Sequence, residues 1–581
     1  MTWIEEGNPS SPLWLIGEAP GYYEEQRRRP FVGPSGDLLN NCLSQAGLSR
    51  HTTFLTNICH LRPPVYTDRN GKRVENDIDQ WFASLRSAKA QAIPELNGRH
   101  PTAPITEGLQ RLRTLIEDCH PRLLVLLGNT PLWAVAAQQG ITKWRGSIID
   151  CVASLHNGST IRCIPAFHPA DCLPARSPHH RPLLVHDLER AKRELERPSP
   201  PPHWQHLVEP KPADVRDWFD QAGAGTPLTC DIETRCGAIA CIGFARSTTE
   251  AICLPLSVVP TSARPTSSYW SLEDEIELLH ILKHELTSRS ITFHNGIFDC
   301  QYIARQWGFA PRYADDTMIM QHTAFPGLIG GKIDPVTGRT DKRGSSISLS
   351  FISSLYCTHY SYWKDDGRLF DPVASLQDGE NNEAQLWRYN CEDCCRTFEC
   401  GLALRAILDR ANLLDQYRFE MDCLPVTFRM MYRGLRIDIA ETRRQRASVI
   451  TQMHAARDWL DTATGTDFNP ESSPQMRALF YDDLALPLRL DKHTRQPSLK
   501  DHDLHRIADQ YPLLAPLITQ IQDYRTLDTV KDDLTASRLS PDRRLRTALN
   551  PAYVETFRYS SNETAFGEGG NLQNLPRSPE D

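Results

Sequence analysis

The sequence predicts a multidomain α/β protein, and three observations lead to this fold class. The chain has 581 residues, which is enough for three or four domains with separate cores. In the first 200 residues, apolar runs such as Leu123–Leu127 alternate with helical patterns, which is typical of an α/β/α layered domain with a mostly parallel sheet. Beyond residue 410, the amphipathic patterns at 441–463 and 513–534 predict a mostly helical region.

A proline-rich sequence marks the clearest boundary between domains. Residues 197–202 read Arg-Pro-Ser-Pro-Pro-Pro, which neither a helix nor a central strand tolerates, so we expect a semi-rigid linker there. We therefore divide the chain into a first domain, a linker, a second domain and a C-terminal region. Their bounds are 1–197, 198–204, 205–410 and 411–581.

The composition is that of an ordinary soluble globular protein, with 40% hydrophobic and 23% charged residues. No apolar run reaches membrane-spanning length and the N-terminus has no export signal, so we expect a cytoplasmic protein without a membrane partner. Its 17 cysteines are then expected to stay reduced and mostly buried. The net charge of −8 does not exclude DNA as a partner, because local patches decide phosphate binding.

Four carboxylates in three separate segments form the strongest functional pattern. Alternation along a strand places Asp231 and Glu233 on one face, and such close like charges call for a cation between them. Asp299 and Asp393 each follow a polar or phenolic side chain by four residues, a spacing that puts both groups on one face of a helix. A strand and two helices of this kind predict a two-metal phosphodiesterase site, and the alternative is a solvated acidic face.

These segments resemble the 3′–5′ proofreading exonucleases of DNA polymerase I-type enzymes. The family's blocks Asp-x-Glu, Asn-x-x-x-Asp and Tyr-x-x-x-Asp all occur in order within 205–410. The resemblance implies an RNase H-like α/β exonuclease domain that holds two divalent cations, Mg²⁺ or Mn²⁺, and digests single-stranded 3′ ends. By position, Tyr389 would orient the attacking water and Asn295 would contact the substrate. The implied metal ligands are Asp231, Glu233, Asp299 and Asp393.

The first domain carries polar groups at the ends of its predicted strands, where α/β proteins bind ligands. The strand at 13–17 runs into Glu18-Ala-Pro-Gly21, and the run at 54–57 ends in Asn57. His168-Pro169 follows a third strand, and a loop at 29–36 precedes a helix. Each of these features is weak alone, since a His-Pro pair is more often structural than catalytic.

Their order and spacing resemble the uracil-DNA glycosylase superfamily, and most of all its iron–sulfur-containing bacterial branch, over residues 10–195. This resemblance implies an α/β/α parallel-sheet glycosylase domain that extrudes uracil from DNA into a pocket. In it, Glu18 and Gly21 would shape the catalytic turn, Phe31 would stack on the base, and Asn57 would read the uracil edge. Glu24 would exclude a 5-methyl group, and His168 would stabilise negative charge on the departing base.

Two departures from that family change the expectations. No cysteine precedes Cys42, and Leu61 and Glu107 fall where later cluster ligands belong, so we predict no iron–sulfur cluster. Ala170 replaces the serine of the usual His-Pro-Ser, which would reduce activity or alter base preference. Three hypotheses for this domain stay open: an active glycosylase, a uracil or DNA sensor without turnover, and a structural relic. The insertion at 66–104 has no assigned role.

The C-terminal region resembles the thumb and first palm segment of DNA polymerase I-type enzymes, notably at 431–438, 468–475 and 555–561. The template-contacting residues implied by this resemblance are Arg558, Asn571, Gln573 and Asn574. The family's two catalytic palm aspartates and its nucleotide-binding helix would follow that segment, and this sequence does not contain them. We therefore expect no primer extension by this chain alone. Either a second polypeptide supplies the palm and fingers, or the sequence is a fragment.

Together these patterns predict a DNA replication and repair protein that combines uracil excision with proofreading, as one subunit of a split polymerase. Such fusions suit a compact bacteriophage or mobile-element system, which would place the protein in the host cytoplasm. The expected partners are uracil-containing DNA, single-stranded 3′ ends and the second polypeptide. The alternative is a non-catalytic assembly subunit that binds DNA and recruits a separate polymerase polypeptide.

Overall fold

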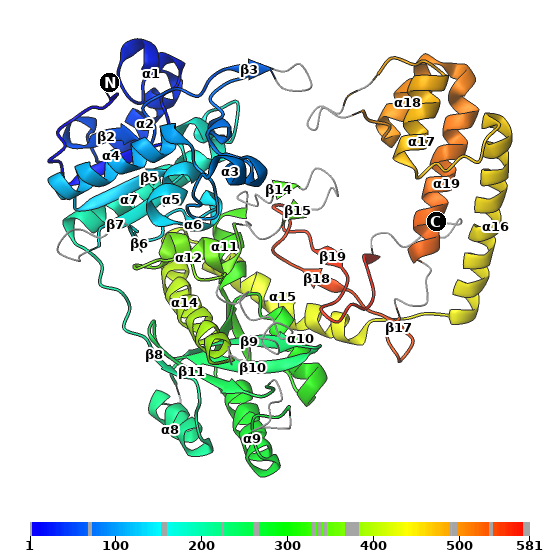
Figure 1. Cartoon of the computed structure of the whole chain (residues 1–581). Helices are drawn as coiled ribbons and strands as arrows, with labels where there is room; N and C mark the ends of the chain where they lie inside the picture. The colour runs from blue at the N-terminus through cyan, green and yellow to red at the C-terminus, as the bar shows by residue number, and fades with distance from the viewer. Residues whose placement is uncertain are drawn as a thin grey trace.

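The computed structural model describes residues 3–67, 73–152, 160–223, 225–258, 267–326, 332–333, 340–341, 346–365, 383–488, 490, 497–533 and 539–572. Two sheet-containing regions lie next to each other, and a long helix, α16 (Ile439–Thr464), leads away from them to a small helical region (Figure 1). None of the described helices is long and apolar enough to cross a membrane.

A five-stranded sheet in the order β2-β1-β5-β7-β6 forms the centre of the first region. The strands are β1 (Leu13–Gly17), β2 (Phe54–Asn57), β5 (Leu123–Leu127), β6 (Ile149–Asp150) and β7 (Arg162–Ala166). All neighbouring pairs are parallel except β6 with β7. The accompanying helices are α1 (Tyr22–Arg27), α2 (Pro34–Gln45), α3 (Leu85–Gln91), α4 (Ala103–Cys119), α5 (Asn129–Ala136), α6 (Ile141–Trp144) and α7 (Arg181–Glu196).

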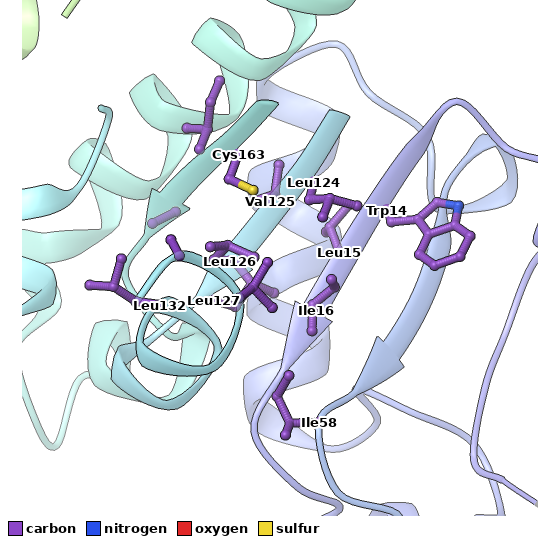
Figure 2. Close-up of a cluster of buried hydrophobic side chains, with 14 of the residues drawn as sticks. Trp14, Leu15, Ile16, Ile58, Leu124, Val125, Leu126, Leu127, Leu132 and Cys163 are labelled. Atoms are coloured by element: carbon purple, nitrogen blue, oxygen red, sulfur yellow. The ribbon is translucent and has the colours of Figure 1, made fainter. Parts of the chain in front are cut away.

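Strands β1 and β5 are buried along their whole length, which explains why both are continuous apolar runs rather than alternating ones. Figure 2 shows side chains of these two strands gathered with Leu132 of α5 and Cys163 of β7. Because β1, β2 and β7 run parallel, the residues that follow them meet at one edge of the sheet. This edge brings together Glu18, Asn57 and His168.

A six-stranded mixed sheet, ordered β13-β12-β9-β10-β11-β8, forms the centre of the second region. Its strands are β8 (Gln205–Leu207), β9 (Leu228–Arg235), β10 (Ala238–Ala245), β11 (Glu250–Pro255), β12 (Ile291–Phe293) and β13 (Tyr313–Asp316). Strand β10 is antiparallel to β9 and β11, whereas β12 is parallel to β9 and β13. The helices are α8 (Pro212–Ala222), α9 (Leu272–Ser288), α10 (Ile297–Trp307), α11 (Thr317–Ala324), α12 (Leu349–Tyr356) and α14 (Glu383–Arg410). Helix α14 packs across β9, β10 and β11.

The predicted linker has no regular structure between the end of α7 at Glu196 and the start of β8 at Gln205. It is tied back onto the first region, because Ser199 donates its backbone N–H to Glu194 at 3.1 Å and its carbonyl accepts from Arg162 at 2.8 Å. The proline-rich segment is therefore attached at its start rather than fully extended.

The described part of the C-terminal region consists of helices and two short two-stranded pairings. The helices are α15 (Leu414–Arg433), α16, α17 (Ser473–Arg477), α18 (Asp501–Gln510) and α19 (Ala515–Asp533). Strands β16 (Leu435–Arg436) and β17 (Arg544–Leu545) pair with each other, as do β18 (Ala548–Asn550) and β19 (Ser560–Asn562). Helices α16, α18 and α19 share an apolar core that includes Leu460, Leu504 and Ile521.

Candidate functional sites

Three carboxylates meet on the second sheet. Asp231 and Glu233 lie on β9 and Asp393 lies on α14, and one ligand oxygen from each lies within 4.8 Å of the others. The packing of α14 across β9 creates this group from segments about 160 residues apart. Among the described residues, no other group of three or more His, Cys, Asp or Glu side chains has a spacing that could hold a metal ion.

Asp299 lies behind the acidic pair rather than within the group of three. It is 3% exposed on α10, and its Oδ1 accepts the backbone N–H of Ile232 at 3.0 Å. Ile232 is the residue between Asp231 and Glu233. Burial and the charge of Asp231 raise the pKa of Asp299 well above its usual range. The fourth predicted carboxylate is thus at the site and braces the strand that presents the other two.

The electrostatics of the cluster favour a bound cation. Burial, with the nearby Asp393, raises the pKa of Asp231 to about 7. Burial, Asp231 and Asp393 together raise the pKa of Glu233 well above its usual range. A divalent cation among these oxygens would relieve the repulsion, and hard carboxylate oxygens are the ligands that Mg²⁺, Mn²⁺ and Ca²⁺ prefer. The residues present therefore fit a divalent metal ion.

Three side chains that the sequence patterns did not single out contact this cluster. Asn390 donates from Nδ2 to Asp231 Oδ2 at 2.9 Å. Trp363 donates from Nε1 to Asp393 Oδ1 at 2.6 Å, and Lys364 Nζ binds Asp393 Oδ2 and donates to the Tyr389 hydroxyl at 2.9 Å. Asn390 adjoins Tyr389 in the sequence and could have been suspected, whereas Trp363 and Lys364 lie outside any periodic pattern.

Asn295 differs from the expectation that it shares a helical face with Asp299. Helix α10 begins at Ile297, so Asn295 lies in the preceding turn, with a left-handed backbone at φ 62°. The carboxylate of Asp316 holds this turn by accepting the backbone N–H of Gly296 at 2.9 Å. The Oδ1 atom of Asn295 is buried without a hydrogen-bond partner among the described residues, so it can accept a bond from a ligand.

A second candidate site lies at the edge of the first sheet, around Gly17. A side chain at Gly17 would collide with the Asn57 amide and the Phe31 ring, so both lie against this glycine. The ring centroids of Phe31 and His168 are 6.3 Å apart. Asn57 is 4% exposed and its Nδ2 has no partner among the described residues. A buried, unsatisfied amide donor that shares the surface of Gly17 with the Phe31 ring is suited to a flat polar ligand.

The environment of His168 defines its protonation state. Its Nδ1 accepts the backbone N–H of Ala170 at 3.2 Å, so the proton of the neutral ring resides on Nε2. Burial lowers the pKa of His168 to about 4, which keeps the ring neutral at physiological pH. Near it, Glu18 accepts a hydrogen bond from Thr130 Oγ1 at 2.5 Å, and burial raises its pKa. The edge therefore combines a neutral donor with a partly buried carboxyl group.

Glu24 makes two hydrogen bonds that the sequence did not predict. Its two carboxylate oxygens accept the backbone N–H groups of Gly21 and Phe31. Phe31 has a left-handed backbone with φ 48°, which is costly for an aromatic residue and requires support. Glu24 therefore holds the turn at Gly21 and the position of the Phe31 ring.

The positions where the resemblance would place cluster ligands do not fit an iron–sulfur cluster. Leu61 and Glu107 are exposed and carry no thiol. Nearby, the Trp3 ring lies 4.5 Å from the His60 ring, and the Arg111 guanidinium lies 4.3 Å above Trp3. Trp3, His60 and Arg111 thus form an aromatic and cationic group beside these positions. An iron–sulfur cluster, in contrast, needs four thiolates.

In the C-terminal region, Arg558 is exposed and Asn571 is partly exposed. The segment around Asn571 is held by the backbone N–H of Leu572, which donates to Ser561 Oγ at 2.9 Å. Gln573 and Asn574 lie outside the described residues.

Comparison with known proteins identifies the first region. Residues 4–190 match the family model of the uracil DNA glycosylase superfamily, so the N-terminal region contains a domain of that superfamily. The chain is 29% identical to the type-4 uracil-DNA glycosylase of Thermotoga maritima over 192 residues, which are 32% of this chain and 80% of that protein.

A second similarity is to DNA polymerase I. The chain is 29% identical to DNA polymerase I of Pseudomonas aeruginosa over 212 residues, covering 36% of this chain and 22% of that protein. Among solved structures, the polymerase domain of Pol1 from M. smegmatis, in complex with DNA primer-template and dNTP, aligns with a TM-score of 0.46 and 16% identity. That alignment covers 64% of this chain and 56% of that chain.

Proposed function

We propose that the protein acts on DNA through two separate sites: the first removes uracil and the second digests 3′ ends with divalent metal ions. We propose further that it works as one subunit of a split DNA polymerase I-type enzyme. The observation that carries the nuclease assignment is the meeting of Asp231, Glu233 and Asp393 around one point. The match of residues 4–190 to the glycosylase superfamily supports the first activity.

For uracil excision, the edge around Gly17 supplies recognition and charge stabilisation. The Asn57 amide can donate to uracil O4 and accept from N3–H, whereas cytosine offers a donor at the corresponding position. Phe31 stacks on the extruded base. As the glycosidic bond breaks, the Nε2 proton of neutral His168 faces the negative charge on the base, and the Glu18 carboxylate stabilises positive charge on the sugar.

A single substitution tests this recognition. Asn57→Asp replaces the donor that faces O4 with an acceptor, so kcat/KM for uracil in single-stranded DNA should fall roughly 10- to 100-fold. Alkaline cleavage of abasic sites in a labelled oligonucleotide measures the excision. If the wild-type protein leaves the oligonucleotide intact, the hypothesis of an active glycosylase is wrong. The domain is then either a uracil or DNA sensor without turnover or a structural relic.

For the nuclease, the sheet order β11-β10-β9-β12-β13, with β10 antiparallel, supports an RNase H-like domain. Two divalent ions bound at such a site would supply activation of a water molecule and stabilisation of the departing 3′ oxygen. Asp231, Glu233 and Asp393 would hold the ions. Asp299 positions strand β9 by accepting the backbone N–H of Ile232, which lies between Asp231 and Glu233. The hydroxyl of Tyr389 lies beside Asp393 and would orient the attacking water, while the Asn295 amide oxygen accepts from the terminal nucleotide.

The nuclease proposal is tested by digestion of a single-stranded 3′ end in Mg²⁺ or Mn²⁺. Asp231→Ala should abolish the digestion while leaving uracil excision within twofold of wild type, because the two sites lie on different sheets. Asp217→Ala, a change at a carboxylate on α8 outside the cluster, provides the matched control and should digest normally. Intact substrate with the wild-type chain would favour the assembly-subunit alternative.

An exposed apolar stripe on α15 supports a docking site for polymerase palm and fingers. Phe419, Val426 and Met430 are 62%, 51% and 57% exposed, and their spacing places them on one face of the helix. A cavity of about 570 Å³ adjoins this face at Met430 and is also lined by Arg433, Arg436 and Arg544. We expect primer extension when a polypeptide carrying the palm motifs is added, and loss of that extension in Met430→Asp.

A further inference from the structure

Residues 357–365, which we name the strap, follow helix α12 and run between the two sheet regions. On one side they contact the first region, which we call the glycosylase-like domain (residues 4–190). On the other side they contact the acidic cluster, which consists of Asp231, Glu233 and Asp393. The strap has no regular secondary structure, so its position depends on these contacts. It connects the first region to the acidic cluster by direct contacts on both sides.

The contacts with the glycosylase-like domain are mostly buried hydrogen bonds. The backbone N–H of Ile148 donates to the Tyr360 carbonyl at 2.6 Å, and the backbone N–H of Tyr362 donates to Ser147 Oγ at 3.2 Å. Arg190 donates to the Cys357 carbonyl at 3.0 Å. Both Ser147 and Arg190 are almost fully buried, so these bonds are protected from water and fix the strap against the first domain.

On its other side, the strap delivers two side chains to the acidic cluster. Trp363 and Lys364 each bind one oxygen of Asp393, and Lys364 also binds the Tyr389 hydroxyl. From α14, Arg396 donates to the His359 carbonyl at 2.6 Å and ties the strap to the helix that carries Asp393. Both oxygens of one predicted metal ligand are therefore oriented by the strap.

We propose that the strap is a positioning element of the nuclease site, that Lys364 is its decisive residue, and that the glycosylase-like domain holds it in place. This inference rests on the nuclease function proposed above. Lys364 fixes the Asp393 carboxylate and the Tyr389 hydroxyl in one arrangement, and its ammonium also competes with a metal ion for Asp393. Removal of the ammonium should thus loosen the positions of the Asp393 carboxylate and the Tyr389 hydroxyl. It should also make the net charge of the acidic cluster more negative.

These two effects have opposite signs, which separates a positioning role from a merely structural one. Lys364→Met should lower kcat for 3′-end digestion roughly tenfold or more, as is usual for residues that orient metal ligands. The same change should tighten Mn²⁺ binding several-fold in calorimetric titration without DNA, because a positive charge has left the cluster. Lys364→Arg keeps the charge, so its Mn²⁺ affinity should stay near wild type with part of kcat retained.

The link to the glycosylase-like domain is tested far from the cluster. Ser147→Ala removes the acceptor of the Tyr362 N–H, and it should lower nuclease kcat roughly threefold or more while uracil excision stays within twofold. Ser44→Ala, on the exposed surface of α2, is the matched control and should change neither activity. Nuclease activity at the wild-type level in Ser147→Ala, or an equal loss of both activities, would contradict the link.

The outcomes distinguish this inference from the proposed function. Wild-type protein that digests no 3′ end would show the nuclease proposal to be wrong, and tighter Mn²⁺ binding in Lys364→Met would still support the contact between the strap and the cluster. Active wild-type protein, with wild-type digestion and unchanged or weaker Mn²⁺ binding in Lys364→Met, would overturn the inference.

Discussion

At the scale of single residues, the pair Glu18 and Thr130 shows how the first site sets the charge of a carboxyl group. Burial raises the pKa of Glu18, and the hydrogen bond from Thr130 lowers it again by stabilising the ionised form. His168, with a pKa of about 4, remains neutral over the range in which Glu18 titrates above its usual value of 4.5. Loss of excision at falling pH should therefore report Glu18.

This gives a prediction with a definite sign. In the proposed mechanism the ionised carboxylate of Glu18 stabilises positive charge on the sugar, so the excision rate should fall as pH falls through its raised pKa. Thr130→Val removes the stabilising hydrogen bond, raises that pKa further and should move the acid limb of the profile to higher pH. Thr130→Ser keeps the hydroxyl and serves as control. Single-turnover excision measured across pH 4 to 8 checks this, and identical acid limbs in Thr130→Val and wild type would contradict it.

At the scale of elements, the acidic cluster depends on how closely α14 approaches β10. Gly243 lies opposite Asp231 in the β9–β10 pairing, and Asn390 of α14 packs directly over it. The same Asn390 holds Asp231 by a hydrogen bond. A glycine at this position therefore sets the distance between the helix that carries Asp393 and the strand that carries Asp231.

We expect Gly243→Ala to force α14 away from the sheet, because the added carbon would collide with the Asn390 amide and lie 3.0 Å from Cys394 Sγ. Overpacking of this kind costs about 1–3 kcal/mol. The variant should unfold at lower denaturant concentration and bind Mn²⁺ more weakly. Gly225→Ala is the control, since nothing lies within 4 Å of the added carbon there. Equal Mn²⁺ affinity in the two variants would show that the approach of α14 does not set the cluster.

At the scale of the whole molecule, a buried charged group joins the two sheet regions. Arg145 pairs with Asp187 inside the first domain, and it donates to Ser354 of α12 at 2.7 Å across the boundary. The side chains of Arg145 and Asp187 are 2% and 0% exposed. A buried pair of this kind adds little net stability, but loss of one partner leaves the other charge uncompensated.

Arg145→Ala should therefore lower the local stability of the first domain by about 3–5 kcal/mol. Native-state hydrogen exchange at amides of α7 and β7 measures this change. Replacement of both partners, in Arg145→Met with Asp187→Leu, should restore most of the loss, because no charge is then left buried. Exchange in Arg145→Ala at the wild-type rate would mean that the pair does not stabilise the first domain.

Local periodicity was sufficient to predict much of this protein. Alternation along one strand placed Asp231 and Glu233 together, and the four-residue spacing of Tyr389 and Asp393 indicated a helix, which is α14. The predicted helical patterns at 441–463 and 513–534 correspond to α16 and α19 within about two residues at each end. The superfamily of the first domain was also evident from its ordered strand ends, and the match over residues 4–190 confirms it.

The tertiary structure alone decided which distant groups touch. Lys364 and Trp363 belong to a segment without periodicity, and only the packing of the strap between two domains brings them to Asp393. Likewise, only folding brings the carboxylate of Glu24 to the backbone N–H groups of Gly21 and Phe31. The physical reason is that a sequence pattern reports which face a residue shares with its neighbours along the chain. The contacts made by that face depend on how helices, sheets and loops from other parts of the chain pack against it.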